Sequence, residues 1–334
     1  MLHRRLARQP LLLPPGSSLL VAVSGGQDSM ALLGLLQDLT RLHRWSLQVW
    51  HGDHGWREES GRQAGELAAW VRARGLTLTI DRWPTPRRSE ADAREWRYGC
   101  LIQRARAAGA ERVVSGHTAS DRAETLLLQL ARGTHRRGLH GPRALRPLCP
   151  GVQLARPLLE FSRDDTARIC RELELPLWPD PSNDDPGFSR NRIRSEVVPV
   201  LEALHPGTAR RLSALSERLA EEEQAGTELV DLALERLRAP GSDGGTDRGS
   251  DGGSNGGSGL DRRRLQALTL ATQRLVLQRW LELGDARRLS ARQLEGLLQR
   301  LAPQRGPGRL SLSAGRELRW DRRHLWLADA ERLP

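Results

Sequence analysis

The sequence predicts an N-terminal α/β domain with a parallel sheet, then a long helical connector and a small mixed α/β module. Two observations predict the first part. The apolar run Leu19–Val23 leads directly into the glycine turn Ser24–Ser29, and such a run before such a turn is typical of a buried parallel strand. Apolar residues then recur at helical spacing from Ala31 to Leu39. Similar pairs of an apolar run and a helical pattern follow along the next hundred residues.

The glycine turn is the first candidate for chemistry, because it joins the carboxyl end of a strand to the amino end of a helix. The free N–H groups and positive dipole of a helix start suit a phosphate. The turn consists of Ser24, Gly25, Gly26, Gln27, Asp28 and Ser29. The glycines let the backbone approach an anion, the serines add hydroxyl donors, and the Asp28 carboxylate suits a magnesium ion that bridges phosphates. A plain turn before a capped helix explains only the glycines.

Two common phosphate motifs are excluded. The chain contains no lysine, so a Walker A loop, which ends in GK[ST], cannot exist. The Rossmann spacing G-x-G-x-x-G is not met in this turn either. The remaining pattern, SGGxDS after a first strand, resembles the PP-loop ATP pyrophosphatases. These enzymes split ATP between its α- and β-phosphates and adenylate a substrate.

The composition is strongly basic, with a formal net charge of +11 and a pI of about 11.1. All 52 cationic side chains are arginines, and Phe, Tyr and Ile are scarce. This pattern is typical of a G+C-rich coding bias, which explains the missing lysine but not the net charge. The charge indicates a polyanionic partner such as nucleic acid, with a solvated basic surface as the alternative.

The three cysteines, Cys100, Cys149 and Cys170, form no CxxC pair. Their spacing argues against a disulfide framework, a cysteine zinc site and a cysteine-ligated iron–sulfur cluster. A reducing cytoplasm fits this usage. No apolar run approaches membrane-spanning length, so we expect a cytoplasmic protein without a membrane partner.

The remaining elements of the N-terminal domain follow from apolar runs, periodicity and helix caps. Further strands are expected at Ser46–Trp50, Leu76–Ile80, Arg112–Ser115 and Val152–Ala155. Helices are expected at Glu58–Arg74, Glu90–Ala108, Ser120–Ala131 and Ser162–Leu173, and another opens at Arg190–Arg194 and ends near Val198-Pro199.

Polar residues follow the second predicted strand, where His51, Asp53 and His54 stand close together. Two imidazoles and a carboxylate are of the kind that bind metal ions. A loop whose polar groups are satisfied by hydrogen bonds is the alternative, and we favour it. Farther on, Arg94 and Arg97 share one helix face. They are placed either to reach phosphates or to pair with neighbouring glutamates, and the sequence leaves both open.

A third group follows the strand Arg112–Ser115, where His117, Asp121 and Glu124 lie at the start of a helix. Asp121 and Glu124 are one turn apart and face the same way. Paired carboxylates beside a phosphate site can hold magnesium or the amino group of a substrate. The alternative is that both only stabilise the helix dipole.

Two arginine-rich stretches are candidates for nucleic-acid contact. No acidic residue occurs between Leu126 and Leu159, a stretch that includes Arg136 and Arg137 among several glycines. A basic glycine-rich loop fits either a clamp for a nucleic-acid backbone or a lid over triphosphate. Arg190, Arg192 and Arg194 form the second stretch. They can grip phosphates, or they can pair with Asp184, Asp185 and Glu196 on a solvated face.

The C-terminal part begins with a long helix, Thr208–Arg238, and the low-complexity stretch Gly241–Gly259. Helices are then expected at Leu260–Leu283 and Ser290–Leu301, and strands at Leu310–Ser313, Glu317–Trp320 and His324–Leu327. The arginines of this module, with Trp320 and Trp326, suit RNA binding, although the tryptophans fit a core equally well. The predicted domains are 1–204, catalytic; 205–240, a helical connector; 241–259, a disordered linker; and 260–334, the C-terminal module.

Seven motifs from Leu20 to about Leu201 together resemble the bacterial tRNA(Ile)-lysidine synthases. In order they are SGGQDS, HGDHGWREES, ADAREWRY, SGHTASDRAETLLLQLARG, RPLL with a following SR, DPSND and RNRIR. The match covers a little over half of the chain. The final module is similar in size and strand content to the family's tRNA-binding region. Ser120 stands where the family often has an acidic residue, and the stretch Gly241–Gly259 resembles an insertion.

The resemblance implies a Rossmann-like sheet of the PP-loop, or adenine nucleotide α-hydrolase-like, type. It also implies a reaction in which free L-lysine is joined to C2 of the wobble cytidine of a tRNA(Ile) with anticodon CAU. The cytidine O2 first attacks the α-phosphate of ATP, and lysine then displaces AMP. The product, lysidine, pairs with A, so the tRNA changes from methionine to isoleucine identity. ATP and Mg²⁺ are the implied cofactors, and a homodimer is left open.

The resemblance also distributes roles over the residues introduced above. ATP binding falls to Ser24, Gly25, Gly26, Gln27, Asp28 and Ser29; catalysis to Asp28, Arg97, His117, Asp121 and Glu124; tRNA binding to Arg136, Arg137, Arg190, Arg192 and Arg194; and magnesium to Asp28 and Asp121. Two alternatives remain at this point. One is a PP-loop enzyme that thiolates tRNA at a 2-position, and the other is a non-catalytic RNA-binding protein.

Overall fold

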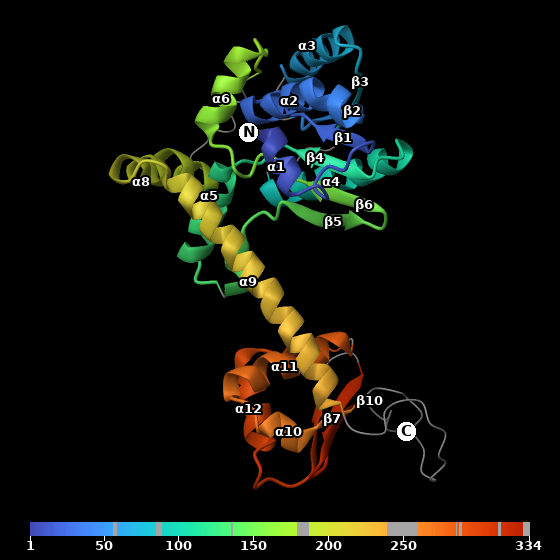
Figure 1. Cartoon of the computed structure of the whole chain (residues 1–334), viewed down its shortest axis with the longest axis vertical. Helices are drawn as coiled ribbons and strands as arrows, with labels where there is room; N and C mark the ends of the chain where they lie inside the picture. The colour runs from blue at the N-terminus through green and yellow to red at the C-terminus, as the bar shows by residue number, and fades with distance from the viewer. Residues whose placement is uncertain are drawn as a thin grey trace. The chain divides into compact units, whose positions relative to one another are not determined.

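The computed structural model describes residues 1–55, 59–84, 89–134, 136–178, 187–238, 259–284, 286, 289–312 and 315–329, without the side chains of residues 90, 136 and 137. The chain forms two compact units, Met1–Glu221 and Glu222–Pro334. The division falls inside the long helix α9 (Thr208–Leu237), which is visible in yellow in Figure 1. The boundaries between the four predicted domains stay predictions, and nearly all of the predicted linker 241–259 lies outside the described residues.

The N-terminal unit is built on a six-stranded sheet in the order β3-β2-β1-β4-β6-β5. Its strands are β1 (Ser18–Ala22), β2 (Ser46–Asp53), β3 (Thr77–Arg82), β4 (Arg112–Ser115), β5 (Leu145–Cys149) and β6 (Val152–Ala155). All neighbours pair in parallel except β5, which runs antiparallel to β6. The parallel sheet confirms the predicted fold class. The basic glycine-rich loop expected between the helix Ser120–Ala131 and the strand Val152–Ala155 is partly regular, because a 3₁₀ turn at Arg136–His140 and the strand β5 lie within it.

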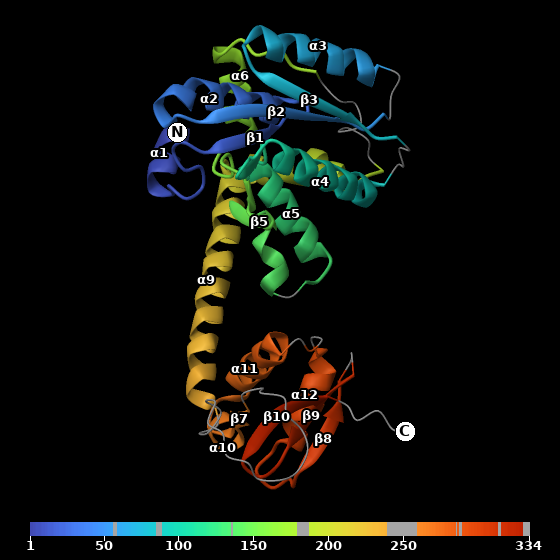
Figure 2. The same ribbon diagram turned by 90° about the vertical axis from the view of Figure 1, so that its right-hand side faces the viewer.

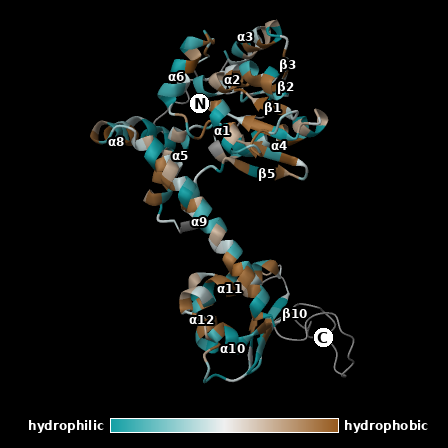
Figure 3. Cartoon of the chain, in the orientation of Figure 1, coloured by the Kyte–Doolittle hydropathy of each residue, from teal (hydrophilic) through white to brown (hydrophobic). Residues whose placement is uncertain are grey.

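Helices cover both faces of this sheet (Figure 2). On one face lie α1 (Leu2–Arg8), α2 (Gln27–His43) and α3 (Ser60–Ala73), and on the other lies α4 (Glu90–Ala107). The alternation of side chains along β1 serves both layers, because Leu19 and Val21 enter the first core and Leu20 the second. The strand is correspondingly apolar throughout its centre (Figure 3).

The strand order reverses between β1 and β4, so their carboxyl ends form the topological switch point of the sheet. Each of these strands is followed by a helix, α2 after β1 and α5 (Ala119–Ala131) after β4. The two helix starts lie close together, because a Cβ added at Gly116 would stand 2.8 Å from the backbone oxygen of Asp28. The fold therefore brings the predicted turn 24–29 and the group 117–124 to one place.

Three further helices complete this unit beside α9: α6 (Arg163–Glu172), α7 (Ser189–Arg192) and α8 (Val198–Leu204). A π-helical turn, Ile193–Val197, connects α7 to α8. The predicted end of the helix near Val198-Pro199 was wrong. Pro199 occupies the first turn of α8, where a missing N–H breaks no helical hydrogen bond, so the helix runs on to Leu204.

The C-terminal unit packs helices against a four-stranded antiparallel sheet in the order β7-β10-β9-β8. Its elements are β7 (Leu260–Asp261), α10 (Arg262–Gln266), α11 (Leu270–Leu283), α12 (Ala291–Arg300), β8 (Gly308–Ser311), β9 (Arg316–Trp320) and β10 (His324–Asp329). The expected single helix Leu260–Leu283 was wrong, because Asp261 and Thr269 each cap a new helix with a side-chain oxygen. Trp320 is buried in the core, and Trp326 is half-buried.

Candidate functional site

The turn after β1 has the geometry of a phosphate loop. Gly25 adopts φ = +86°, which is unfavourable for any residue with a Cβ, and Gly26 is the N-cap of α2. The Ser24 and Ser29 hydroxyls lie 3.1 Å apart, and the Ser29 hydroxyl donates to the Gly26 carbonyl at 2.8 Å. These hydrogen bonds hold the turn in one shape, with the first turn of α2 behind it.

Helix α6 supports this turn, and sequence reasoning missed that support. The Gln27 amide donates to the Arg163 carbonyl at 2.7 Å and to the Thr166 hydroxyl at 2.8 Å. The same hydroxyl lies 2.5 Å from Asp28 Oδ1. The Gln27 side chain therefore faces α6, and only its backbone remains for the predicted contact with ATP. Nothing in the sequence marks the fully buried Thr166, because its partners in the turn, Gln27 and Asp28, lie 139 and 138 residues away.

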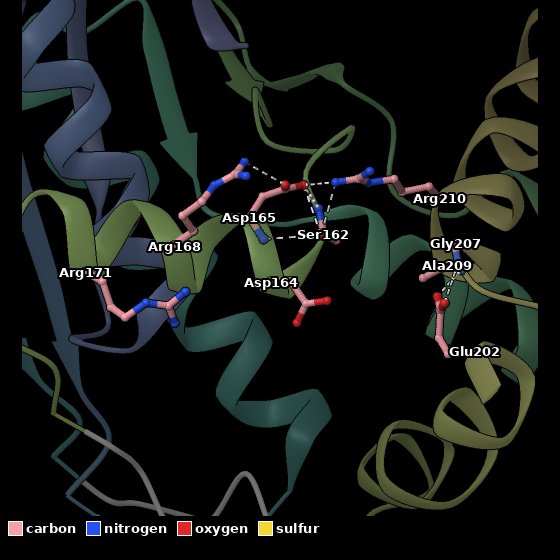
Figure 4. A pocket seen from close by; sticks show the side chains of 9 residues that line it. All are labelled: Ser162, Asp164, Asp165, Arg168, Arg171, Glu202, Gly207, Ala209 and Arg210. Atoms are coloured by element: carbon pink, nitrogen blue, oxygen red, sulfur yellow. Dashed lines mark hydrogen bonds and ion pairs between the residues drawn. The ribbon is translucent and has the colours of Figure 1, made fainter.

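The far side of α6 is held by a charged cluster around Asp165 (Figure 4). Asp165 forms a capping box with Ser162 and accepts hydrogen bonds from Arg168 and from Arg210 of α9. A cavity of about 400 Å³ lies beside this cluster, with Asp164 at its edge. The ion pairs tie α6 to the start of α9 and so keep Thr166 beneath Asp28.

Trp178 forms a second support that the sequence did not indicate. Its backbone N–H donates to the Gly25 carbonyl at 3.0 Å, and its indole N–H donates to Glu66 of α3 at 2.8 Å. A Cβ at Gly25 would stand 3.4 Å from the side chain of Trp178. The tryptophan therefore forms a wall of the turn.

The carboxylates predicted on α5 are joined to two arginines. Asp121 closes a capping box with Thr118, whose N–H donates to Asp121 Oδ2 at 2.7 Å. Arg190 donates to Asp121 Oδ1 and to Glu124 Oε2, each at 2.8 Å. Arg194 donates to both oxygens of Glu124, at 2.8 and 3.0 Å. Because the Glu124 side chain is only 2% exposed, this is a nearly buried charge cluster.

This arrangement bears on the three arginines predicted to contact tRNA. Arg190 and Arg194 pair with the carboxylates of α5, whereas Arg192 forms an exposed pair with Glu196 at 2.9 Å. Residues 184 and 185, the other expected partners, lie outside the described residues, as do the side chains of Arg136 and Arg137. A role of these arginines in tRNA binding stays a prediction.

The protonation of the site follows from burial and these charges. Burial lowers the pKa of His117 to about 3, against the pull of Asp121 and with the help of Arg156, Arg190 and Arg97. The imidazole is therefore neutral at physiological pH, and its Nδ1 lies 3.0 Å from the Ser115 hydroxyl. Burial alone would raise the pKa of Asp121, but His117, Arg190 and the Thr118 N–H hold it below its usual value.

The pKa of Asp28 is shifted upward, in the opposite direction to that of Asp121. Burial raises its pKa, the Thr166 hydroxyl opposes this, and the negative charge of Asp121 raises it further. The structure thus brings Asp28 and Asp121 close enough to repel each other. The second oxygen of Asp28 takes part in none of the hydrogen bonds or ion pairs among the described residues.

Two further arginines add positive potential near His117. Arg156 is 2% exposed and donates to the Arg143 carbonyl at 2.8 Å and to the Tyr98 hydroxyl at 3.4 Å. Arg97 of α4 is the second, and its charge also lowers the pKa of His117. Arg94 was expected on the same helix face as Arg97. Its guanidinium carbon lies 5.1 Å from the centre of the Tyr98 ring.

The group His51, Asp53 and His54 follows the interpretation favoured from the sequence. His51 Nδ1 lies 2.8 Å from the Val23 carbonyl oxygen, and Asp53 accepts from the Gly55 N–H at 2.9 Å. His54 packs edge-on against aromatic rings. Across the described parts of the chain, no group of three or more His, Cys, Asp or Glu side chains is placed to hold a metal ion. The expected loop was wrong in one detail, because His51 and Asp53 still belong to β2.

Comparison with known proteins defines the class first. The PP-loop domain family matches residues 3–201, so the chain contains a PP-loop, ATP-using domain. It is 51% identical to a tRNA(Ile)-lysidine synthase of Parasynechococcus marenigrum, over 96% of this chain and 91% of the relative. It is 42% identical to a second one, from Prochlorococcus marinus, over 98% of this chain and 94% of that relative. The chain belongs to the tRNA(Ile)-lysidine synthase family.

A solved structure confirms the fold. A U34-tRNA thiolase from Methanococcus maripaludis with its [4Fe-4S] cluster superimposes with a TM-score of 0.56 and 17% identity. The match covers 66% of this chain and 78% of the thiolase. At this identity the likeness concerns the fold alone. Membership of the tRNA(Ile)-lysidine synthase family does not favour the two alternative functions, a tRNA-thiolating enzyme and a non-catalytic RNA-binding protein. Among the described helices, none is long and apolar enough to cross a membrane.

Proposed function

We propose that this protein joins L-lysine to C2 of the wobble cytidine in a tRNA(Ile) with anticodon CAU, at the expense of ATP. In the first step, the cytidine O2 attacks the α-phosphorus of ATP and pyrophosphate leaves. In the second, the ε-amino group of lysine attacks C2, and O2 leaves as part of AMP. The amine loses a proton, and the product is lysidine.

One observation carries this proposal. In a chain 51% identical to a tRNA(Ile)-lysidine synthase over nearly its whole length, the phosphate loop and the α5 carboxylates meet at the β1–β4 switch point. A reaction that uses ATP and a cationic amino acid needs an anion site and a cation site side by side. The turn at the start of α2 supplies the anion site, and the carboxylates of Asp121 and Glu124 on α5 supply the cation site.

The phosphate loop receives the pyrophosphate part of ATP in this scheme. The backbone N–H groups at Gly25, Gly26 and Gln27 and the hydroxyl of Ser24 are the donors, and the Ser29 hydroxyl would join them by leaving the Gly26 carbonyl. Arg97 supplies positive charge for the phosphorus that is transferred. Because His117 is neutral, it can form a hydrogen bond with the adenylate, as donor or as acceptor, without adding a charge.

Magnesium fits the acidic part of the site. The ion is usually held by one or two carboxylates together with substrate phosphates. Asp28 has an oxygen outside the hydrogen bonds of the described residues, and its pKa is raised partly by Asp121. A cation beside these two carboxylates would relieve that repulsion. Asp28 would hold it, and Asp121 would contribute by giving up its bond to Arg190. When bound, magnesium neutralises charge on the leaving pyrophosphate.

Lysine binding falls to Asp121 and Glu124. Both carboxylates are occupied by Arg190 and Arg194, so the lysine ammonium must compete with guanidinium groups for them. This exchange favours a ligand that also brings a carboxylate, because the displaced arginine then finds a new partner.

Arg190, Arg192 and Arg194, with Arg136 and Arg137, remain the proposed tRNA contacts. The cytoplasm is the proposed location, and a homodimer is the proposed but open oligomeric state.

The test uses purified protein, magnesium-ATP, labelled lysine and a CAU-anticodon tRNA(Ile) transcript. We expect acid-precipitable label with the transcript and none when the wobble cytidine is replaced by uridine. Asp121→Asn should abolish lysine transfer and leave tRNA affinity nearly unchanged, whereas the exposed α6 variant Asp164→Asn should transfer lysine like the wild type. Tight tRNA binding without lysine incorporation or AMP release in the wild type would contradict the proposal.

A further inference from the structure

Helix α6 and the residues that follow it pack closely along α2, the helix that begins in the phosphate loop. A Cβ added at Gly34 would stand 2.9 Å from the side chain of Leu175 and 3.0 Å from that of Leu173, so the two segments are in direct contact. Nearer the loop, the Cys170 thiol donates to the Gln27 carbonyl at 3.3 Å. The start of α2 is therefore held firmly against α6.

Two side chains at this contact, Gln27 and Thr166, form a chain of hydrogen bonds that ends on Asp28. The Gln27 amide nitrogen donates to the Arg163 carbonyl at 2.7 Å and to the Thr166 hydroxyl at 2.8 Å. The Thr166 hydroxyl in turn lies 2.5 Å from Asp28 Oδ1 and 2.9 Å from the Arg163 carbonyl oxygen. We call Gln27 and Thr166 the polar relay.

The single proton of the Thr166 hydroxyl goes to Asp28. The hydroxyl oxygen already accepts a hydrogen bond from Gln27, and the Arg163 carbonyl accepts one from the same amide. A hydrogen bond to an ionised carboxylate is shorter and stronger than one to a neutral carbonyl. Thr166 is also fully buried, so bulk water does not compete for the contact. The polar relay therefore runs from the Gln27 amide through the hydroxyl to the carboxylate.

The polar relay makes the two oxygens of Asp28 unequal. Oδ1 is bonded to Thr166, whereas Oδ2 takes part in none of the hydrogen bonds or ion pairs among the described residues. Asp28 lies in the first turn of α2, beside the phosphate loop. In metal sites, hydrogen-bond partners of this kind orient a ligating carboxylate and raise the affinity for the ion.

We propose that Gln27 and Thr166 are positioning residues of the metal–ATP site, which hold Asp28 by Oδ1 and leave Oδ2 for a divalent cation. That the cation accompanies ATP rests on the proposed function. The alternative is a purely structural contact, in which Thr166 only anchors α6 to α2. Packing alone needs no hydroxyl between an amide and a carboxylate, and Cys170 already anchors the same part of α2.

The experiment separates the hydroxyl from the packing in the full-length protein. Thr166→Val removes the hydroxyl and nearly keeps the shape of the side chain, whereas Thr166→Ser keeps the hydroxyl and removes a methyl group. Cys170→Ala is the matched control, because it alters the same helix contact without removing a bond to Asp28. Manganese(II) replaces magnesium. Its affinity in the presence of α,β-methylene ATP, which resists cleavage between those phosphates, is measured by electron paramagnetic resonance.

We expect Thr166→Val to weaken manganese binding about tenfold, and Thr166→Ser and Cys170→Ala to stay within about twofold of the wild type. Gln27→Met, which removes the donor to Thr166, should weaken binding in the same direction by about threefold. In tRNA-dependent AMP release, Thr166→Val should need about tenfold more magnesium and approach the wild-type rate at saturation. A merely structural defect would instead lower the rate at every magnesium concentration.

Three results would overturn the inference. In the first, Thr166→Val binds manganese like the wild type. In the second, Thr166→Val and Thr166→Ser are weakened equally, which assigns the effect to packing. In the third, Cys170→Ala is weakened as much as Thr166→Val, which assigns the effect to the helix contact as a whole. Urea denaturation shows whether each variant folds. If Thr166→Val does not fold, Gln27→Met decides, and wild-type manganese affinity in that variant would overturn the inference.

The lysine-incorporation assay tests the proposed function separately, because manganese binding needs neither tRNA nor lysine. A wild type that incorporates no lysine but binds manganese through the Thr166 hydroxyl loses the proposed function and keeps the polar relay. A wild type that incorporates lysine, but whose manganese affinity is independent of that hydroxyl, keeps the proposed function and loses the polar relay. The two proposals can therefore fail separately.

Discussion

The two units both gather arginine side chains, but they neutralise them in different ways. At the sheet edge of the N-terminal unit, Arg190 and Arg194 are bonded to Asp121 and Glu124 at distances of 2.8–3.0 Å. In the C-terminal unit, Arg262 is bonded to backbone carbonyls. The exposed side chains of Arg263, Arg305 and Arg322 form no ion pair with an acidic residue in the described part of that unit. Both regions look equally basic in the sequence.

The difference teaches which ligand each region suits. A cluster whose charges are already matched binds a new ion only by exchange, which favours a ligand that carries both charges, such as an amino acid. A cluster with unmatched charges attracts any polyanion and does so over a longer range. Counting arginines therefore indicates an anionic partner, whereas their pairing decides where on the chain that partner can be held.

The largest expected effect concerns the stability that the α5 carboxylates give to Arg190 and Arg194. Glu124→Gln leaves Arg190 and Arg194 without their main anionic partner in a nearly buried cluster. We expect the free energy of unfolding to fall by about 3 kcal/mol, because breaking a buried ion pair strands the remaining charge. Urea denaturation of the full chain measures this.

The matched control is Glu196→Gln, which breaks the exposed pair with Arg192. It should leave the urea midpoint unchanged within error, since exposed pairs contribute little. If the two variants shifted the midpoint equally, the distinction between matched buried arginines and surface arginines would not hold.

Much of this comparison was beyond the reach of the sequence. The phosphate loop and the strands β1, β4 and β6 were predictable, because apolar runs, glycines and caps act over a few residues. The bonds of Arg190 to Glu124 and of Thr166 to Asp28 span 66 and 138 residues, and no local pattern encodes them. The sequence offered Asp184, Asp185 and Glu196 as partners of the three arginines. Arg192 pairs with Glu196, whereas Arg190 and Arg194 pair with the carboxylates of α5.

Two elements show the same limit within the fold. The strand β5 contains Pro147, which an antiparallel edge strand tolerates but a buried parallel strand does not. Its sequence therefore lacks the apolar run that identified the other strands. The break between α10 and α11 depends on the cap at Thr269, which periodicity alone does not reveal. The tertiary partner therefore decides the first case, whereas the second depends on a local helix cap that the apolar pattern does not show.

A smaller effect concerns pH, to which the N-terminal cluster should respond through His117. Its pKa is lowered from 6.5 to about 3, so between these values the unfolded chain binds a proton that the folded chain does not. Stability is then fully present above pH 6.5 and falls as the pH falls toward 3. From pH 7.5 to 5.5 we expect this residue to remove about 1 kcal/mol of unfolding free energy.

The measurement compares urea denaturation of the wild type and His117→Asn at these two pH values. The variant should lose less stability on acidification, while His205→Asn, at an exposed position, should follow the wild type. Identical losses in all three proteins would show that His117 is not held neutral by its surroundings.

The smallest expected effect concerns Arg192, whose acidic partner is exposed. It tests whether such an arginine is available to bind phosphate, as an arginine without an acidic partner is. The Arg192–Glu196 pair is open to solvent, so Arg192 can leave it for a phosphate at little cost. If Arg192 contacts tRNA, Arg192→Ala should reduce the salt slope of tRNA binding by about one. Glu196→Gln should instead strengthen binding slightly, because it frees the guanidinium. Opposite signs in fluorescence anisotropy would place Arg192 with the unmatched arginines, and no change in either variant would leave tRNA contact to other residues.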